Sequence, residues 1–191
     1  MILVGLKARP HQAYRLFPTP FPLRRYAQVF PTIELFWWHH LPDLRTIQRL
    51  RSQVPSAFRF SAYGHKHLTF QTSGQERRSL RRLLRRFRAF GEQKGALRLE
   101  VPLLEEEIFV PWLGLLEEVW QEEGRPQIAL LVPQGLKELV LERGFSVVNG
   151  GGPFHYLLDP GELPPGEGFA YFTGLEEALG ALQTGGAGLD S

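Results

Sequence analysis

Short apolar runs alternate with stretches of helical periodicity along almost the whole chain of 191 residues. This alternation favours a mainly parallel sheet, because each parallel strand needs a crossover that returns the chain to the same end of the sheet. Eight runs have the length and the flanking Pro or Gly residues expected of strands. They cover residues 2–5, 32–36, 58–62, 96–101, 127–132, 145–148, 155–158 and 169–172.

Helical periodicity lies between most of these runs. Asp43 is a predicted N-cap for one helix, whose inner face would hold Leu44, Ile47, Leu50 and Val54. Gly144 is placed to end another helix in a left-handed conformation. The six predicted helices cover residues 23–30, 44–54, 75–90, 112–123, 134–143 and 175–183.

Eight strands with intervening helices predict an α/β fold of the TIM-like (β/α)8 barrel type. The chain is short for this fold, since such barrels usually run to about 250 residues. No helix fits between residues 148 and 155, and only a Pro/Gly loop spans residues 160–168. We therefore expect one barrel domain over residues 1–185, trimmed in its second half, with a flexible tail over residues 186–191. The alternative is an open doubly wound parallel sheet of five or six strands.

Composition excludes several classes of protein. The chain has no cysteine, so disulfides, thiol nucleophiles, zinc–cysteine sites and iron–sulfur clusters are excluded. No apolar run reaches the roughly 18 residues of a membrane helix, and the first residues lack the pattern of a secretory signal. We expect a cytoplasmic protein that does not bind membranes. Its 15 prolines and its few thermolabile residues, with one Met and one Asn, suit a heat-adapted protein. A GC-rich genome would also favour its excess of Arg over Lys.

Residues 23–34 read LRRYAQVFPTIE, and residues 58–69 read FRFSAYGHKHLT. These two segments resemble the YecE-like family, domain of unknown function 72 (DUF72). Residues 96–102 resemble a further strand of that family, and residues 128–132 and 169–174 match it more weakly. The resemblance implies a TIM-barrel-like fold. It implies no activity, because the family has none that could be transferred.

The sequence departs from the family at most polar signature positions. Only Glu34 carries over, so the resemblance implies a shortened and diverged member of the family. The missing signature residues also favour a further hypothesis, which is a degenerate barrel with only an interaction role. The departures are Leu35-Phe36-Trp37-Trp38 in place of an Asn-Ser stretch, Tyr63 for a Lys, Glu100 for a Gln, residues 130–134 for a Glu-Phe-Arg-His motif, and Tyr171 and Thr173 for an Arg and a His.

Polar residues follow several predicted strands, where barrel proteins of this type hold their sites. Histidine, tyrosine and carboxylate side chains at these positions suggest general acid–base chemistry on a small molecule. His65 and His67, two apart on extended chain, could hold a divalent metal together with Glu34. The structural alternative is solvated histidines and a Glu34 whose hydrogen bonds are made inside the barrel. Neither a cofactor nor a substrate is identified. The candidate catalytic residues are Glu34, His39, Tyr63, His65, His67 and Glu100.

Charge is divided very unevenly along the chain. Residues 1–99 hold 19 Lys and Arg against 4 Asp and Glu, whereas residues 100–191 hold 3 against 16. Arginines cover one side of the predicted helix 75–90, which suggests a non-catalytic module that binds nucleic acid or an acidic partner. The candidate residues for that face are Arg78, Arg81, Arg82 and Arg85.

A structural interpretation of these arginines is favoured over a phosphate partner. The next predicted helix carries Glu117, Glu118, Glu122 and Glu123, so arginine–glutamate pairs could link the two helices. A third interpretation is a homo-oligomer in which the basic face of one copy meets the acidic face of another.

Overall fold

A computed structural model describes residues 1–9 and 23–185 of the chain. The tail predicted over residues 186–191 lies outside the described residues. The elements in chain order are β1 (Ile2–Leu6), α1 (Leu23–Val29), β2 (Thr32–Phe36), α2 (Leu44–Ser52), β3 (Arg59–Gly64), α3 (Gly74–Arg88), η1 (Gly91–Gln93), β4 (Lys94–Glu100), α4 (Glu106–Glu122), β5 (Gln127–Leu131), η2 (Gln134–Leu136), α5 (Lys137–Glu142), β6 (Ser146–Val147), β7 (His155–Leu158), β8 (Gly168–Phe172) and α6 (Leu175–Thr184).

The eight strands form one parallel sheet in the order β6-β5-β4-β3-β2-β1-β8-β7. Its two ends, β6 and β7, are held together without a strand ladder. The Asn149 N–H donates to the carbonyl oxygen of Tyr156 at 2.9 Å. The Ser146 hydroxyl donates to the carbonyl of Phe154 at 2.7 Å and accepts from its N–H at 3.2 Å. The sheet is therefore a nearly closed barrel. The predicted TIM-like fold is confirmed, and the open doubly wound alternative is wrong.

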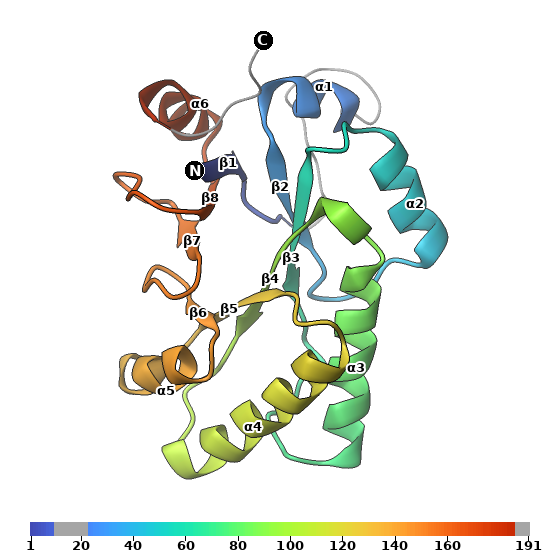
Figure 1. Cartoon of the computed structure of the whole chain (residues 1–191), viewed down its shortest axis with the longest axis vertical. Coiled ribbons are helices and arrows are strands. Elements are labelled where there is room, and N and C mark those ends of the chain that lie inside the picture. Colours follow the sequence, from blue (N-terminus) through green and yellow to red (C-terminus); the bar gives the residue numbers. More distant parts are fainter. Residues whose placement is uncertain (10–22, 186–191) are drawn as a thin grey trace.

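The helices cover the barrel unevenly, as Figure 1 shows. The first five strands are followed by helices α1 to α5, whereas β6 and β7 are joined by a tight turn. In that turn the Val147 N–H donates to Gly151 O at 2.8 Å, and Asn149 takes a left-handed φ of 58°. A loop over residues 159–167 joins β7 to β8 without a helix. The predicted trimming of the second half is confirmed, and it accounts for the short chain.

Two details of the helices differ from the prediction. Helix α4 begins at Glu106, six residues earlier than expected, and runs through Pro111. Pro111 lies near the helix start, where it removes a single backbone N–H from the ladder. Leu44 was placed on the inner face of α2 but is 55% exposed, whereas Ile47 is fully buried. Leu44 directly follows the capping residue Asp43, whose carboxylate accepts the Thr46 N–H at 2.7 Å. At this first position of the helix, Leu44 lines a surface hollow together with arginines of α3.

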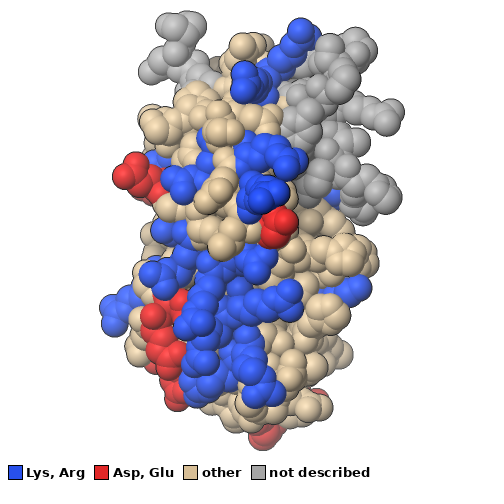
Figure 2. Space-filling view, turned by 90° about the vertical axis from the view of Figure 1, so that its right-hand side faces the viewer, with Lys and Arg blue, Asp and Glu red and all other residues tan. Residues whose placement is uncertain are grey.

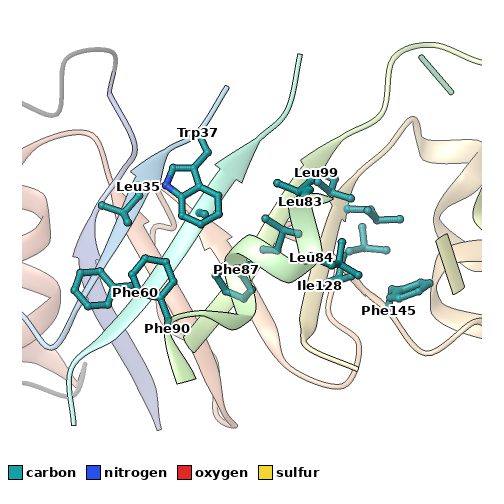
Figure 3. Packing of buried hydrophobic residues seen from close by; sticks show 14 of the residues in the cluster. Leu35, Trp37, Phe60, Leu83, Leu84, Phe87, Phe90, Leu99, Ile128 and Phe145 are labelled. Carbon is teal, nitrogen blue, oxygen red and sulfur yellow. The ribbon is translucent and has the colours of Figure 1, made fainter. Parts of the chain in front are cut away.

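Apolar side chains gather in two separate clusters. The larger fills the space between the strands and the surrounding helices, where Trp37 and Phe60 both stack on Phe90, with ring centroids 5.8 and 4.7 Å apart (Figure 3). The smaller lies inside the barrel and includes Phe169 and Tyr171. Its members come from alternate positions of the strands, since successive side chains of a strand point to opposite faces.

Candidate functional site

A buried ion pair lies inside the barrel, close to the carboxyl ends of the strands. Arg98 on β4 donates from Nε to Oε2 of Glu34 on β2 at 2.9 Å, and from Nη2 to Oε1 at 3.0 Å. The two side chains are 5% and 0% exposed, respectively. The Tyr156 hydroxyl on β7 donates to Oε2 as well, and the Ala8 N–H donates to Oε1 at 2.9 Å. The Glu34 carboxylate thus accepts four hydrogen bonds from three segments of the chain.

The period of two along each strand brings these groups together. On β4, Arg98 lies between Leu97 and Leu99, which are buried in the outer cluster beneath the helices. On β2, Glu34 lies likewise between Ile33 and Leu35. The polar member of each alternation therefore faces the barrel interior, and the apolar members face the helices.

Burial and the neighbouring charges fix the protonation of this assembly. Desolvation by itself would lower the pKa of Arg98, but the Glu34 carboxylate outweighs it and the pKa lies above its ordinary value. Complete burial, together with the negative charge of Glu34, raises the pKa of Tyr156 well above 10. Arg98 is therefore a permanent cation, and the Tyr156 hydroxyl acts only as a hydrogen-bond donor toward the carboxylate.

A second polar layer lies next to the ion pair on the side of the strands' carboxyl ends, which form the mouth of the barrel. The guanidinium of Arg98 stacks on the Tyr63 ring, with 3.8 Å between its central carbon and the ring centroid. Trp38 also stacks on Tyr63, with ring centroids 5.3 Å apart. The Tyr63 hydroxyl donates to Oε2 of Glu100. Burial and the nearby Glu100 raise the pKa of Tyr63, so its hydroxyl keeps its proton at neutral pH. Of the six predicted site residues, Glu34, Tyr63 and Glu100 are thus linked through Arg98.

The histidines lie apart from the ion pair. His65 is buried, and its Nδ1 lies 2.9 Å from the carbonyl oxygen of Trp37. Burial lowers the pKa of His65, and the nearby His67 and Arg82 lower it further. The rings of His65 and His67 are 4.9 Å apart, so this predicted pair does form. His39 is exposed, with its ring 5.6 Å from that of Phe36.

The predicted set of metal ligands is not assembled among the described residues. Glu34 has four donors as partners, and none of them is a histidine. Within residues 1–9 and 23–185, no group of three or more His, Asp and Glu side chains is placed to hold a metal ion. The geometry joins His65 to His67, and Glu34 to Arg98, as two separate units.

Charged groups of both signs lie at the ends of β1, β7 and β8. Lys7 Nζ lies 3.9 Å from Oδ2 of Asp159. Asp159 accepts from the N–H and the hydroxyl of Thr173 at 2.7 and 2.8 Å. The Arg9 guanidinium donates to the Thr173 carbonyl. These contacts link the ends of β1, β7 and β8. In the strand order, these three strands lie across the barrel from β3, which carries Tyr63.

Sequence reasoning missed Arg98 and Tyr156, which complete the central assembly. A signal for Arg98 was present, because Ala96, Arg98 and Glu100 share one face of a strand and Glu100 was already a candidate. Tyr156 lies on a strand next to the trimmed part of the barrel, and no nearby motif singled it out.

The arginines of α3 form a second candidate surface. Arg81 donates to Glu122, the last residue of α4, at 3.1 Å, and Arg85 donates to the following C-cap residue, Glu123, at 2.8 Å. The predicted arginine–glutamate pairs between the two helices are thereby confirmed. Arg78 and Arg82 make no ion pair within the part of the chain that the structure describes. Of the four residues predicted for this face, Arg81 and Arg85 are therefore paired with carboxylates, whereas Arg78 and Arg82 are not.

Comparisons with known proteins bear on the fold. The family model described as "Protein of unknown function DUF72" matches residues 9–107. A crystal structure of a DUF72 family protein from Enterococcus faecalis V583, at 3.10 Å resolution, matches with a TM-score of 0.72 and 15% identity, covering 100% of this chain and 98% of that one. A second structure, at 2.52 Å, gives a TM-score of 0.60 and 12% identity, with 95% and 97% covered. No curated protein matches. At these identities, the structural likeness speaks for the fold alone.

No helix in the described part of the chain has the length and apolar character needed to cross a membrane.

Proposed function

Because this chain belongs to the DUF72 family, whose description assigns no function, we propose a function from its own geometry: the carboxyl-end mouth of the barrel binds a small organic molecule. In this proposal Arg98 binds an acceptor group of the ligand, which is a carboxylate, a phosphate or a carbonyl oxygen. Glu34 and Tyr156 are positioning residues that hold the guanidinium in place. Tyr63 and Glu100 form the upper wall.

The observation that carries the proposal is the buried ion pair of Glu34 and Arg98 at this end of the barrel. A buried ion pair contributes little net stability compared with apolar side chains of similar size, because desolvation offsets the attraction. The other members of the inner cluster include Phe154 and Phe169, and the deeper polar group of Tyr171, Ser61 and Thr32 carries no charge. Charges placed at the functional end of this fold favour a binding role over a purely structural one.

The hydrogen-bonding capacity of Arg98 supports the choice of ligand group. Its Nε and Nη2 are used by Glu34, and among the described residues Nη1 makes no hydrogen bond. A guanidinium stacked on an aromatic ring and fixed by a carboxylate is preorganised to donate its remaining N–H groups. Lys7 and Arg9, at the end of β1, add positive charge on the same rim.

The upper wall can add acid–base chemistry. Glu100 is partly exposed and accepts the Tyr63 hydroxyl. A ligand hydroxyl or amine that displaces this bond would meet Glu100 as its proton acceptor. Tyr63, which keeps its proton, would then donate to a ligand oxygen. The partly buried ring of Trp38 offers a stacking surface beside them.

The test is a ligand screen on the untagged full chain. Thermal unfolding is followed with a panel of inorganic phosphate, monocarboxylates, dicarboxylates, sugar phosphates and nucleoside monophosphates, and native mass spectrometry reports any molecule retained through purification. A compound that raises Tm is then titrated into Y63F and E100Q by calorimetry. We expect each variant to raise Kd about tenfold or more, because a hydrogen bond to a charged group contributes roughly 1.5–3 kcal/mol.

The matched control is Y171F. The Tyr171 hydroxyl is also buried and bonded, to Ser61 at 2.6 Å and Thr32 at 2.8 Å, but it lies deeper in the barrel and has no hydrogen bond to Glu34 or Arg98. This variant should lower Tm and leave Kd unchanged. A panel without a single stabilising compound would overturn the proposal. So would equal affinities in Y63F, E100Q and the wild-type protein, since the polar interior would then be a structural feature only.

A further inference from the structure

The arginines of α3 form two rows with different surroundings. One row faces α4: Arg77 and Arg81 pair with Glu122 at 3.6 and 3.1 Å, and Arg85 and Arg88 pair with Glu123 at 2.8 and 3.0 Å. Glu123 is only 4% exposed, so its charge is largely committed to this row. The row therefore links two helices, and its positive charge is largely neutralised.

The second row consists of Arg78, Arg82 and Arg86, spaced four residues apart along the helix. Arg78 donates to the Gln75 side chain at 3.0 Å, and Arg86 donates to the carbonyl oxygen of Pro42. Neither partner carries a charge. Arg82 makes no hydrogen bond or ion pair with any residue in the described ranges. Three cations on one helix face thus have no carboxylate partner there.

These three residues line a surface hollow of about 510 Å³ together with Arg81, Arg85 and the exposed Leu44. Figure 2 shows the basic side chains as a continuous belt over α3 that extends toward α2, with the acidic side chains confined mainly to one edge. The carboxylate of Asp43, beside Leu44, is engaged in capping α2. The hollow is therefore a concave, almost purely cationic surface.

The chemistry of the hollow selects among polyanions. Guanidinium groups bind phosphate oxygens through paired hydrogen bonds, and four residues of helix place successive members of the row about 6 Å apart. A protein partner would need an apolar or aromatic anchor at the centre of the contact, and Leu44 is the only apolar residue that lines this hollow. Side-chain amides suited to reading adenine are likewise missing from its lining.

From these observations we infer that the row of Arg78, Arg82 and Arg86 binds the phosphate backbone of nucleic acid without reading its sequence. This inference does not rest on the proposed ligand site, because no residue of the barrel mouth takes part. Each arginine replaces counterions on the backbone, so the affinity falls steeply as salt rises. The acidic edge formed by α4 confines the bound strand to one side of α3.

The test is fluorescence anisotropy with a labelled single-stranded RNA of about 20 nucleotides and mixed sequence, titrated at roughly 50 to 200 mM NaCl. The variant is R78Q/R82Q/R86Q, and the charge-matched control is R24Q/K94Q/K137Q, which changes α1, β4 and α5 instead. The three α3 side chains have no charged partner in the described structure, so the variant should fold, and its Tm confirms this.

We expect the α3 variant to bind roughly tenfold or more weakly than the control. The slope of log K against log salt should become shallower by about 2, or roughly 0.7 for each lost phosphate contact. A second RNA of unrelated sequence should bind equally well. Absence of binding at about 50 mM salt overturns the inference, as does equal weakening in both variants. Preferential binding to phosphatidylserine vesicles or to an acidic peptide also overturns it, since the surface would then serve another partner.

Discussion

Removal of one partner of the Glu34–Arg98 pair is the most informative perturbation of this barrel. In E34Q the Arg98 cation stays at 5% exposure without a counter-charge, and in R98M the Glu34 carboxylate stays fully buried without one. Breaking a buried ion pair on one side typically destabilises a protein by about 3–5 kcal/mol. The two single variants should therefore each lower the free energy of unfolding by about that amount.

The double variant E34Q/R98M should be far more stable than the sum of the two changes predicts. It buries no net charge, and the amide carbonyl oxygen introduced at position 34 can still accept from either Tyr156 or Ala8, which use separate oxygens of the native carboxylate. One of these donors loses its acceptor, which costs about 1–3 kcal/mol. We expect a total loss of about that size, against a sum of roughly 6–10 kcal/mol, so the coupling energy is at least about 3 kcal/mol.

Equilibrium urea unfolding, followed by tryptophan fluorescence and far-ultraviolet circular dichroism, measures all four corners of this cycle. The slope of unfolding free energy against urea should be the same for each protein, so that midpoints can be compared directly. A double variant that is destabilised by the full sum would refute the reasoning. It would mean that Glu34 and Arg98 act independently, through their packing and their other hydrogen bonds.

Three further predictions test other parts of the structure. Burial lowers the pKa of His65 below 6.5 in the folded protein. As the pH drops through 6.5, the unfolded chain binds a proton at this histidine before the folded protein does, so the stability of the fold decreases. H65Q should flatten this part of the Tm–pH profile. E123Q should lower the free energy of unfolding by about 1–2 kcal/mol, whereas E118Q, at 61% exposure, should lower it by less than about 1, as urea midpoints will show. E76Q should lower the free energy of unfolding by about 2–4 kcal/mol in the same assay. The buried Glu76 carboxylate accepts from N–H groups, including Trp112 Nε1 at 2.8 Å, so the NH2 group of a glutamine would face other donors. A loss below about 0.5 kcal/mol would contradict this account.

The fold was readable from the sequence because its strongest signals are local. The runs at residues 32–36 and 155–158 coincide with β2 and β7, and the tight turn in place of a helix followed from the Gly- and Pro-rich residues after 148. The predicted helix 112–123 starts six residues later than α4, because the apolar periodicity that predicts it begins at Leu113, after the proline inside the helix. The exposed Leu44 was misplaced because periodicity alone does not reveal where a helix has a neighbour.

The site was harder to predict because a barrel reverses the usual meaning of an alternating strand. In a sheet with one face in water, the polar positions face the solvent. Here the helices cover the outer face, so the apolar residues of β4 point outward and Arg98 points into the barrel. The sequence of β4 looks the same in both cases. The decision between them depends on whether the sheet closes, which is a property of all eight strands together.

Closure also explains why the tyrosines of β7 and β8 reach the polar residues of β2 to β4. Large side chains from one wall face small ones from the other: the Tyr171 hydroxyl bonds to Ser61, and a Cβ added to Gly95 would lie 3.2 Å from the Phe169 ring. The missing helices around β6 and β7 leave this complementarity intact, because it lies on the inner face. The tyrosines thus tie the shortened half of the barrel to the complete half, and Tyr156 does so through Glu34 itself. Loss of the outer helices in this chain is therefore compatible with a fully formed interior.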